Sequence, residues 1–147
     1  MPWQVRRTAS EEETIALGEE LARALKPPAV VLLIGELGAG KTTLAKGIIQ
    51  GLGAARAEDV TSPTFTLIHE FGTAPKVYHV DLYRIEEPRE LATLGLEELL
   101  EREAIVLVEW GERFPGLWPA DSLEVRLRAL DGDEREIRVV YRLKRKD

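Results

Sequence analysis

The feature that most constrains this sequence is an apolar run that leads directly into a glycine-rich segment. Residues 29–34 are AVVLLI, a continuous run typical of a strand buried on both faces of a parallel sheet. Residues 35–43 are GELGAGKTT, which fits the pattern G-x-x-x-x-G-K-[ST]. Residues 44–52 have the pattern of a helix. A buried strand, this segment and a helix, in that order, predict a phosphate-binding loop, or P-loop.

The chemistry of such a loop follows from its residue types. Glycines let the backbone turn its N–H groups toward phosphate oxygens, and the positive end of the following helix faces the same anion. Lys41 places a point charge near the β- and γ-phosphates, and the hydroxyl of Thr42 suits Mg²⁺. We therefore predict nucleotide contacts along the whole loop: Gly35, Glu36, Leu37, Gly38, Ala39, Gly40, Lys41, Thr42 and Thr43.

Two further apolar strands end in carboxylates. Residues 77–80 are followed by Asp81, and residues 105–108 are followed by Glu109. In P-loop proteins a neighbouring strand supplies a carboxylate that holds Mg²⁺ or orients water. A single acidic residue after a strand also suits a solvated turn, but two such residues downstream of a P-loop favour a role in the site. We predict Lys41, Asp81 and Glu109 as catalytic residues, and Thr42, Asp81 and Glu109 as metal ligands.

The rest of the chain alternates strands and helices. We expect strands over 3–8, 65–71, 77–82, 123–130 and 136–143, the last two joined by a turn at 131–133. A capping box predicts a helix from Glu11 that ends by Pro27-Pro28, and residues 88–102 carry one or two short helices broken near Gly95. This order predicts one domain over 1–147: a three-layer α/β fold of the P-loop NTPase type, with antiparallel strands added to a parallel central sheet.

Composition limits the function classes. The net charge of −6 argues against broad, nonspecific nucleic-acid binding. The basic residues at 142–146 are either a local basic strip or a solvated end, and the solvated end is favoured. The absence of cysteine excludes disulfides, thiolate metal sites and thiol nucleophiles. No apolar run approaches the length of a membrane span, and the first residues lack the pattern of a signal peptide. We therefore expect a cytoplasmic protein with no membrane association.

Three features are open to a plain or a functional interpretation. Residues 61–64, TSPT, are either a proline turn or a switch segment whose hydroxyls sense the γ-phosphate. His69 and His79 are interpreted as residues on strand faces rather than as a metal pair, because they lie too far apart for a local site. Trp110 is either core packing or a wall of the site.

At this point the motifs resemble those of a known family. The loop at 35–43, TSPTFTL at 61–67, HVDLYR at 79–84 and VEW at 108–110 resemble, in order and spacing, the TsaE family, also called YjeE. The resemblance covers essentially the whole chain, although the two terminal segments match only loosely. It implies a bacterial P-loop ATPase needed for N6-threonylcarbamoyladenosine in tRNA. The implied partner is a TsaD–TsaB-type complex whose turnover the nucleotide cycle supports, with tRNA met only indirectly.

The resemblance also implies roles for individual residues. Lys41 and the loop backbone bind phosphates, Thr42 and Glu109 hold Mg²⁺, and Asp81 lies close to the metal and the γ-phosphate. Three residues are added to the nucleotide contacts on the same basis: Thr64 as part of a switch segment, with Thr8 and Arg135 near the adenine or ribose.

The nucleotide and the reaction are predicted separately. GTPases of the Ras type recognise guanine with an Asn-Lys-x-Asp motif, and this chain contains no asparagine, so ATP is favoured. Two other functions stay open: a small-molecule kinase on the same phosphate site, and a nucleotide-dependent docking module with negligible turnover. Weak self-association is also left open. The chain has no long insertion that would supply the lid and acceptor pocket of a kinase.

Overall fold

A single seven-stranded sheet forms the centre of the molecule. The structure is a computed structural model that describes residues 3–63 and 67–141. The sheet has the strand order β1-β7-β6-β2-β5-β4-β3. In chain order its strands are β1 (Trp3–Thr8), β2 (Ala29–Ile34), β3 (Ile68–Phe71), β4 (Lys76–Asp81), β5 (Ala104–Glu109), β6 (Leu123–Ala129) and β7 (Arg135–Tyr141).

The middle of the sheet is parallel and its edges are antiparallel. β2 pairs in parallel with β5 on one side and β6 on the other, and β4 continues the parallel set beyond β5. β3 is added antiparallel to β4, while β7 and β1 are added antiparallel beyond β6. The predicted parallel centre with antiparallel additions is therefore confirmed. Since the four central strands run in one direction, their carboxyl ends meet at one edge of the sheet.

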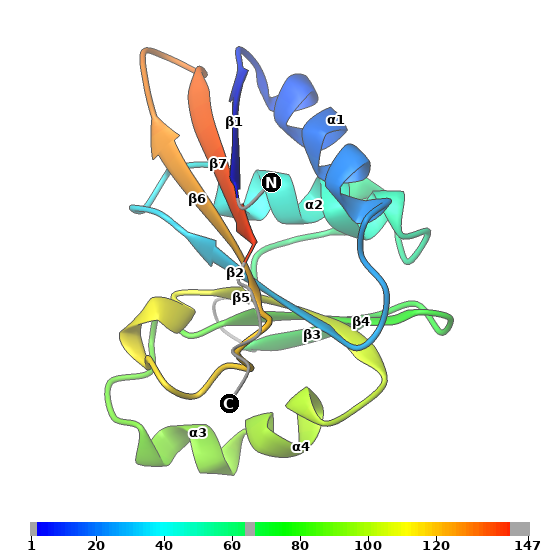
Figure 1. Ribbon diagram of the computed structural model, residues 1–147, viewed down its shortest axis with the longest axis vertical. Helices are drawn as coiled ribbons and strands as arrows, with labels where there is room; N and C mark the ends of the chain where they lie inside the picture. The colour runs from blue at the N-terminus through cyan, green and yellow to red at the C-terminus, as the bar shows by residue number, and fades with distance from the viewer. Residues whose placement is uncertain (1–2, 64–66, 142–147) are drawn as a thin grey trace.

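Helices lie on both sides of the sheet (Figure 1). Helices α1 (Glu11–Ala22) and α2 (Lys41–Gly51) cover one face, and the short helices α3 (Arg89–Thr93) and α4 (Leu96–Leu100) lie against the other. Two 3₁₀ turns, η1 (Ala57–Asp59) and η2 (Gly111–Arg113), were not anticipated from the sequence. Among the described residues, no helix has the length and apolar character needed to cross a membrane.

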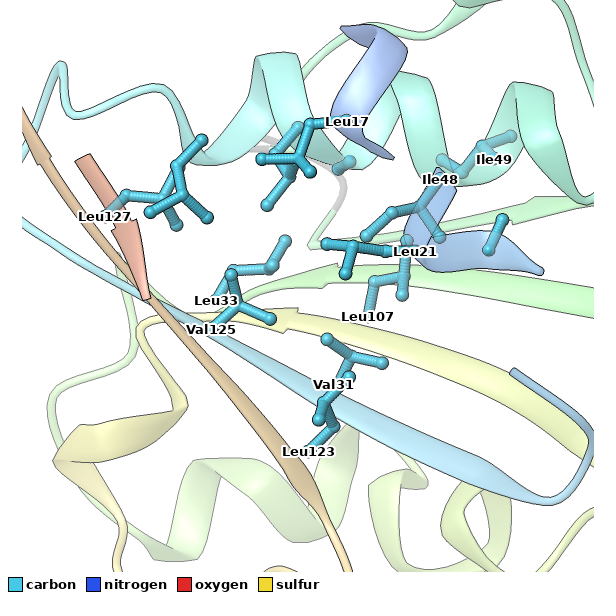
Figure 2. Close-up of a cluster of buried hydrophobic side chains, with 14 of the residues drawn as sticks. Leu17, Leu21, Val31, Leu33, Ile48, Ile49, Leu107, Leu123, Val125 and Leu127 are labelled. Carbon is cyan, nitrogen blue, oxygen red and sulfur yellow. The ribbon is translucent and has the colours of Figure 1, made fainter. Parts of the chain in front are cut away.

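The apolar run in β2 supplies both cores because successive strand residues point to opposite faces. Val31 and Leu33 pack with Leu17, Leu21, Ile48 and Ile49 of the α1–α2 layer, as Figure 2 shows. Val30 and Leu32 instead join the cluster that contains α3 and α4. A strand buried on both sides is what the uninterrupted AVVLLI run predicts.

Most element boundaries match the predictions, with three informative differences. α2 begins at Lys41, inside the glycine-rich loop and not after it, because Gly40 serves as its N-cap with φ of 100°. α1 ends at Ala22, well before the proline pair, through a tightened last turn in which Arg23 N–H reaches the Glu20 carbonyl. The strand predicted from residue 65 begins only at Ile68, because Leu67 has φ of 70°, which is not a strand conformation. Residues 65–66, and the predicted end of the last strand at 142–143, lie outside the described residues.

Close helix contact fixes the position of α2 relative to α1. Gly18 and Gly47 lie where the two helices touch, and a Cβ at Gly18 would be 2.6 Å from the Leu44 carbonyl oxygen. A Cβ at Gly47 would overlap the Ile15 carbonyl. Only glycine allows this approach. Because the P-loop leads directly into α2, this contact also helps to set the position of the loop.

Candidate functional site

The candidate site lies where three parallel strands end. The glycine-rich loop follows β2, Glu109 is the last residue of β5, and Asp81 is the last residue of β4. Asp81 and Glu109 are direct neighbours in the register of β4 and β5. Ligands of open α/β sheets bind at the carboxyl ends of the strands. The sheet thus brings together the loop and both carboxylates that the sequence singled out.

Two glycines in the loop are required by geometry. Gly40 has φ of 100°, in the left-handed region that L side chains rarely adopt. At Gly35 the backbone passes so close to β6 that a Cβ would be 2.6 Å from the Leu127 carbonyl oxygen. These two positions are the two glycines that the loop pattern demands. Their constraint is consistent with a backbone shaped to enclose a ligand rather than an incidental turn.

Lys41 is buried and turned back onto the loop. Its Nζ donates a hydrogen bond of 2.7 Å to the Gly35 carbonyl and lies 3.4 Å from the centre of the Trp110 ring. Burial lowers the pKa of Lys41 below its usual value, although the nearby carboxylates of Glu109, Glu112 and Asp81 oppose the shift. The side chain is therefore a partly desolvated cation held between an indole face and a carbonyl.

Glu109 is the most connected acidic residue of the site. Its side chain is buried, with 3% of the residue exposed. Thr42 Oγ1 donates to Glu109 Oε2 at 3.0 Å and to Oε1 at 3.3 Å. His79 Nε2 lies 2.7 Å from Oε2. Glu109 thus joins the first turn of α2 to strand β4.

Asp81 faces the same region and is also buried. Its Oδ1 accepts a hydrogen bond of 2.9 Å from the backbone N–H of Tyr83. Its Oδ2 is 3.5 Å from the hydroxyl of Ser62, in the hydroxyl-rich segment that precedes β3. Ser62 is therefore the described residue that connects this segment to the carboxylates.

A cavity of about 390 Å³ opens between these groups. Its size suits a small-molecule ligand. Its lining includes the following residues, which were predicted or belong to motifs discussed above: Gly38, Gly40, Lys41, Thr42, Thr43, Ser62, Asp81, Glu109 and Arg135. Leu37, predicted as a contact, also lines it with a largely exposed side chain. Gly35, Glu36 and Ala39 do not line the cavity; Ala39 is buried, and its N–H closes a turn onto the Glu36 carbonyl.

The remaining predicted contacts fall in three different places. Arg135 reaches the loop from β7, and its guanidinium donates to the Gly38 carbonyl at 3.2 Å. Thr8 does not line the cavity; its buried hydroxyl lies 2.7 Å from that of Thr14, which does. Thr64 lies outside the described residues.

Sequence reasoning missed several residues around the site. Glu11, Thr14, Tyr83 and Asp133 line the cavity without having been predicted as site residues, although Tyr83 belongs to the HVDLYR motif. His79 was interpreted only as a strand-face residue. It does lie on β4, but it is fully buried against Glu109. Its signal was a polar residue inside an apolar strand, two positions before Asp81 and hence on the same face.

Trp110 fulfils both interpretations given to it. It packs against the core on the α3–α4 side and also lines the cavity beside Lys41. Its backbone has φ of 66°, which turns the chain sharply after Glu109. The Arg113 guanidinium lies 4.9 Å from the same ring. The indole therefore contacts two cations at the edge of the site.

The donor set suits a hard divalent cation. Thr42, Asp81 and Glu109 offer one hydroxyl and two carboxylates, and oxygen ligands are those that Mg²⁺ prefers. No cluster of three or more His, Asp or Glu side chains suited to a metal ion occurs in the described part of the chain. Mg²⁺ does not require one, because it usually keeps several waters and binds through one or two carboxylates and substrate phosphates. The residues present therefore fit Mg²⁺.

Fold and site together define a class of protein. A glycine-rich loop joins a buried central strand to a helix N-terminus, with a lysine and two carboxylates at the same sheet edge. Loops of this kind bind phosphate through backbone N–H groups and the helix dipole. The molecule is a mixed α/β protein whose glycine-rich loop, lysine and carboxylates are arranged as a phosphate-binding site would require.

Comparison with known proteins identifies the family within that class. Residues 8–137 match the family described as "Threonylcarbamoyl adenosine biosynthesis protein TsaE". A TsaE protein of Bacillus subtilis is 43% identical over 133 residues, covering 89% of this chain and 81% of the relative. One of Rickettsia bellii is 42% identical over 127 residues, covering 86% and 87%. The chain belongs to the TsaE family.

A solved structure has a similar fold. The crystal structure of YdiB from Bacillus subtilis superposes with a TM-score of 0.76 at 34% sequence identity, covering 95% of this chain and 85% of that one. The curated relatives are named tRNA threonylcarbamoyladenosine biosynthesis proteins. The family resemblance found in the sequence motifs is thereby confirmed.

Proposed function

We propose that this chain is a Mg²⁺-dependent ATPase of the P-loop NTPase type that serves the threonylcarbamoyladenosine modification of tRNA. The observation that carries the proposal is the grouping of Lys41, Thr42, Asp81 and Glu109 around one cavity at the carboxyl ends of β2, β4 and β5. The phosphates of ATP bind along the loop, where backbone N–H groups and Lys41 receive them. Binding moves Lys41 away from the Gly35 carbonyl and the Trp110 ring.

The reaction is transfer of the γ-phosphoryl group to water. The water oxygen attacks the γ-phosphorus, and the bond to the β–γ bridging oxygen breaks, which yields ADP, phosphate and a proton. Glu109 and Asp81, which both line the cavity, are proposed to orient the water and accept its proton. When bound, Mg²⁺ neutralises charge on the phosphates, and Thr42, Glu109 and Asp81 are the residues that would hold it.

Turnover is expected to be slow for the isolated chain. Many P-loop switches hydrolyse nucleotide efficiently only when a partner protein supplies a missing catalytic residue, often an arginine. Here Arg113 donates to the Tyr83 carbonyl at 2.5 Å and stacks on aromatic rings, so it is already engaged in this structure. A TsaD–TsaB-type complex is the proposed partner. The chain acts on tRNA indirectly, through that complex, and its proposed location is the cytoplasm. ATP cleavage would then reset a shape that this complex recognises.

The test is phosphate release from ATP by the purified chain, alone and with a TsaD–TsaB-type complex. The Lys41→Ala variant, checked for folding by circular dichroism, is the control, because it removes the phosphate-binding charge. We expect slow release by the chain alone, stimulation by the complex, and loss of both with Lys41→Ala. Formation of threonylcarbamoyladenosine in tRNA over several cycles would depend on the same lysine.

Two results would redirect the proposal. A phosphorylated metabolite in place of free phosphate would indicate a kinase. Nucleotide binding without turnover, with a folded protein and an active partner complex, would indicate a docking module.

A further inference from the structure

His79 is a fully buried polar residue to which neither the family motifs nor the proposed chemistry assigns a role. It lies in β4 with 0% of its surface exposed, between the apolar residues Tyr78 and Val80. Within the described chain its ring Nδ1 is buried and has no hydrogen-bond partner. Leaving a buried polar atom unpaired costs roughly 1–3 kcal/mol. An apolar side chain of similar size would therefore give a more stable fold at this position, unless the other ring nitrogen makes an interaction that matters for function.

The other ring nitrogen contacts Glu109. His79 Nε2 lies 2.7 Å from Glu109 Oε2, and both side chains are buried. An ionised carboxylate only accepts hydrogen bonds, so Nε2 carries the hydrogen, whatever the charge of the ring. Short hydrogen bonds to a carboxylate in a buried site are strong and directional. The imidazole therefore fixes the rotation of the Glu109 carboxyl group.

The two oxygens of Glu109 are not equivalent. Oε2 accepts from both His79 Nε2, at 2.7 Å, and Thr42 Oγ1, at 3.0 Å. Among the described residues, Oε1 has only the longer contact of 3.3 Å from Thr42. If Thr42 turns its hydroxyl toward a metal ion, Oε2 remains held by His79. Oε1 is then the oxygen with free lone pairs at the cavity.

We propose that His79 is a positioning residue that holds Oε2 of Glu109 and so leaves Oε1 available to the metal and the attacking water. The inference rests on the proposed ATPase function. It also explains why one strand carries both His79 and Asp81: two positions apart, they share a face of β4. That strand then supplies one carboxylate directly and orients the other across the β4–β5 pair. Partners that orient metal-binding side chains are often nearly as important as the ligands themselves.

Two substitutions separate positioning from space filling. His79→Met replaces the ring with an apolar side chain and removes the donor. His79→Gln keeps an N–H donor that can reach Glu109. A role in packing alone predicts similar behaviour from both variants, because neither keeps the shape of the ring. A positioning role predicts that His79→Met impairs the Mg²⁺ dependence of ATP hydrolysis and that His79→Gln largely keeps it. Thermal unfolding of both variants checks that they fold.

The measurements are the Mg²⁺ dependence of ATP hydrolysis and the binding of ADP without metal. We expect His79→Met to raise the Mg²⁺ concentration for half-maximal rate about 10-fold and to lower kcat, with the KM for ATP at saturating Mg²⁺ little changed. ADP affinity in excess chelator should equal that of the wild-type protein, because the loop and Lys41 are unchanged. His79→Gln should restore the Mg²⁺ dependence. Equal Mg²⁺ dependence in all three proteins would overturn the inference and leave the ATPase proposal standing.

The ring itself gives a readout that does not need ATPase activity. Nitrogen-15 spectra of the wild-type protein should show His79 Nε2 bonded to hydrogen, with a proton protected from exchange. In Glu109→Gln that resonance should shift from its position in the wild-type protein. An Nε2 without hydrogen, or a spectrum unchanged by Glu109→Gln, would overturn the positioning role. If the wild-type protein neither bound nor hydrolysed ATP, the ATPase proposal would fail, whatever the spectra show for His79.

Discussion

At the scale of single residues, the state of Lys41 in the free protein sets a testable pH dependence. Burial lowers its pKa in the folded state, whereas the unfolded chain keeps the usual value of 10.5. Between the two values the unfolded state binds more protons, so raising the pH through this window favours the folded state. We expect the free energy of unfolding of the wild-type protein, minus that of Lys41→Met, to increase from neutral pH toward pH 10.5.

Denaturant unfolding of both proteins at a series of pH values measures this difference. Lys41→Met keeps an unbranched side chain one atom shorter and removes the ionisable group, so other titrations cancel in the subtraction. A difference that stays flat or decreases with pH would show that Lys41 is not desolvated in the folded protein. The same lowered pKa predicts that nucleotide affinity begins to fall at a lower pH than an ordinary lysine would give.

Glu109 offers a second prediction at this scale. Glu109→Gln keeps the size of the side chain and removes its charge, so the general-base and metal-binding capacity of the carboxylate is lost. We expect ATP hydrolysis to fall by about 100-fold or more, since general-base catalysis contributes on that order. ADP binding without metal should persist, because the loop and Lys41 are intact. Phosphate release and a nucleotide titration check the two parts, and unchanged hydrolysis would remove Glu109 from the reaction.

At the scale of elements, the contact between α1 and α2 predicts a stability effect far from the cavity. Gly47→Ala places a methyl group against the Ile15 carbonyl, a backbone group that cannot move without shifting α1. We expect a loss of roughly 1–3 kcal/mol in the free energy of unfolding, the usual cost of overpacking a close contact. Denaturant unfolding measures it.

The matched control is Glu12→Ala, an exposed substitution on α1 that should change stability by no more than about 0.5 kcal/mol. Gly47→Ala should also weaken nucleotide binding, because α2 carries Lys41 and Thr42 at its start. Stability equal to that of the control would mean that the helices do not approach as closely as described.

The elements themselves were largely predictable, because their signals are local. The AVVLLI run, the capping box at Ser10–Glu13 and the break at Gly95 each correspond to the structure observed. Boundaries were less predictable where a backbone feature decides them, as at Gly40, whose positive φ starts α2 inside the loop. The 3₁₀ turns after β5 and before the hydroxyl-rich segment had no clear pattern.

The site was predictable only as far as its chemistry is carried by motifs. Lys41, Thr42, Asp81 and Glu109 were found because a P-loop requires a hydroxyl and carboxylates nearby. The contact of Arg135 with Gly38 joins residues 97 positions apart, so no local pattern predicts it. The partnership of His79 with Glu109 depends on the pairing of β4 with β5, which follows from sheet order and not from sequence spacing.

At the scale of the whole molecule, the cavity joins parts of the sheet that are otherwise separate. Arg135 comes from β7 on one side of β2, whereas Asp81 and Glu109 come from β4 and β5 on the other. Glu11 and Thr14 add the first turns of α1. A ligand that fills the cavity would contact all of these elements at once. Binding should therefore stabilise the folded chain as a unit.

That coupling gives the final prediction, for thermal unfolding with and without ADP and Mg²⁺. A ligand that binds only the folded state at 100 times its Kd contributes about 2.7 kcal/mol, which raises the Tm of a chain of this size by roughly 5–10 °C. Lys41→Ala should abolish the shift while leaving the unliganded protein folded, because it removes the charge that receives the phosphates. GDP should give no larger shift than ADP if the site is an adenine-nucleotide site. An equal shift in wild-type protein and Lys41→Ala would mean that the nucleotide binds elsewhere, and the absence of any shift would argue against a nucleotide site in this cavity.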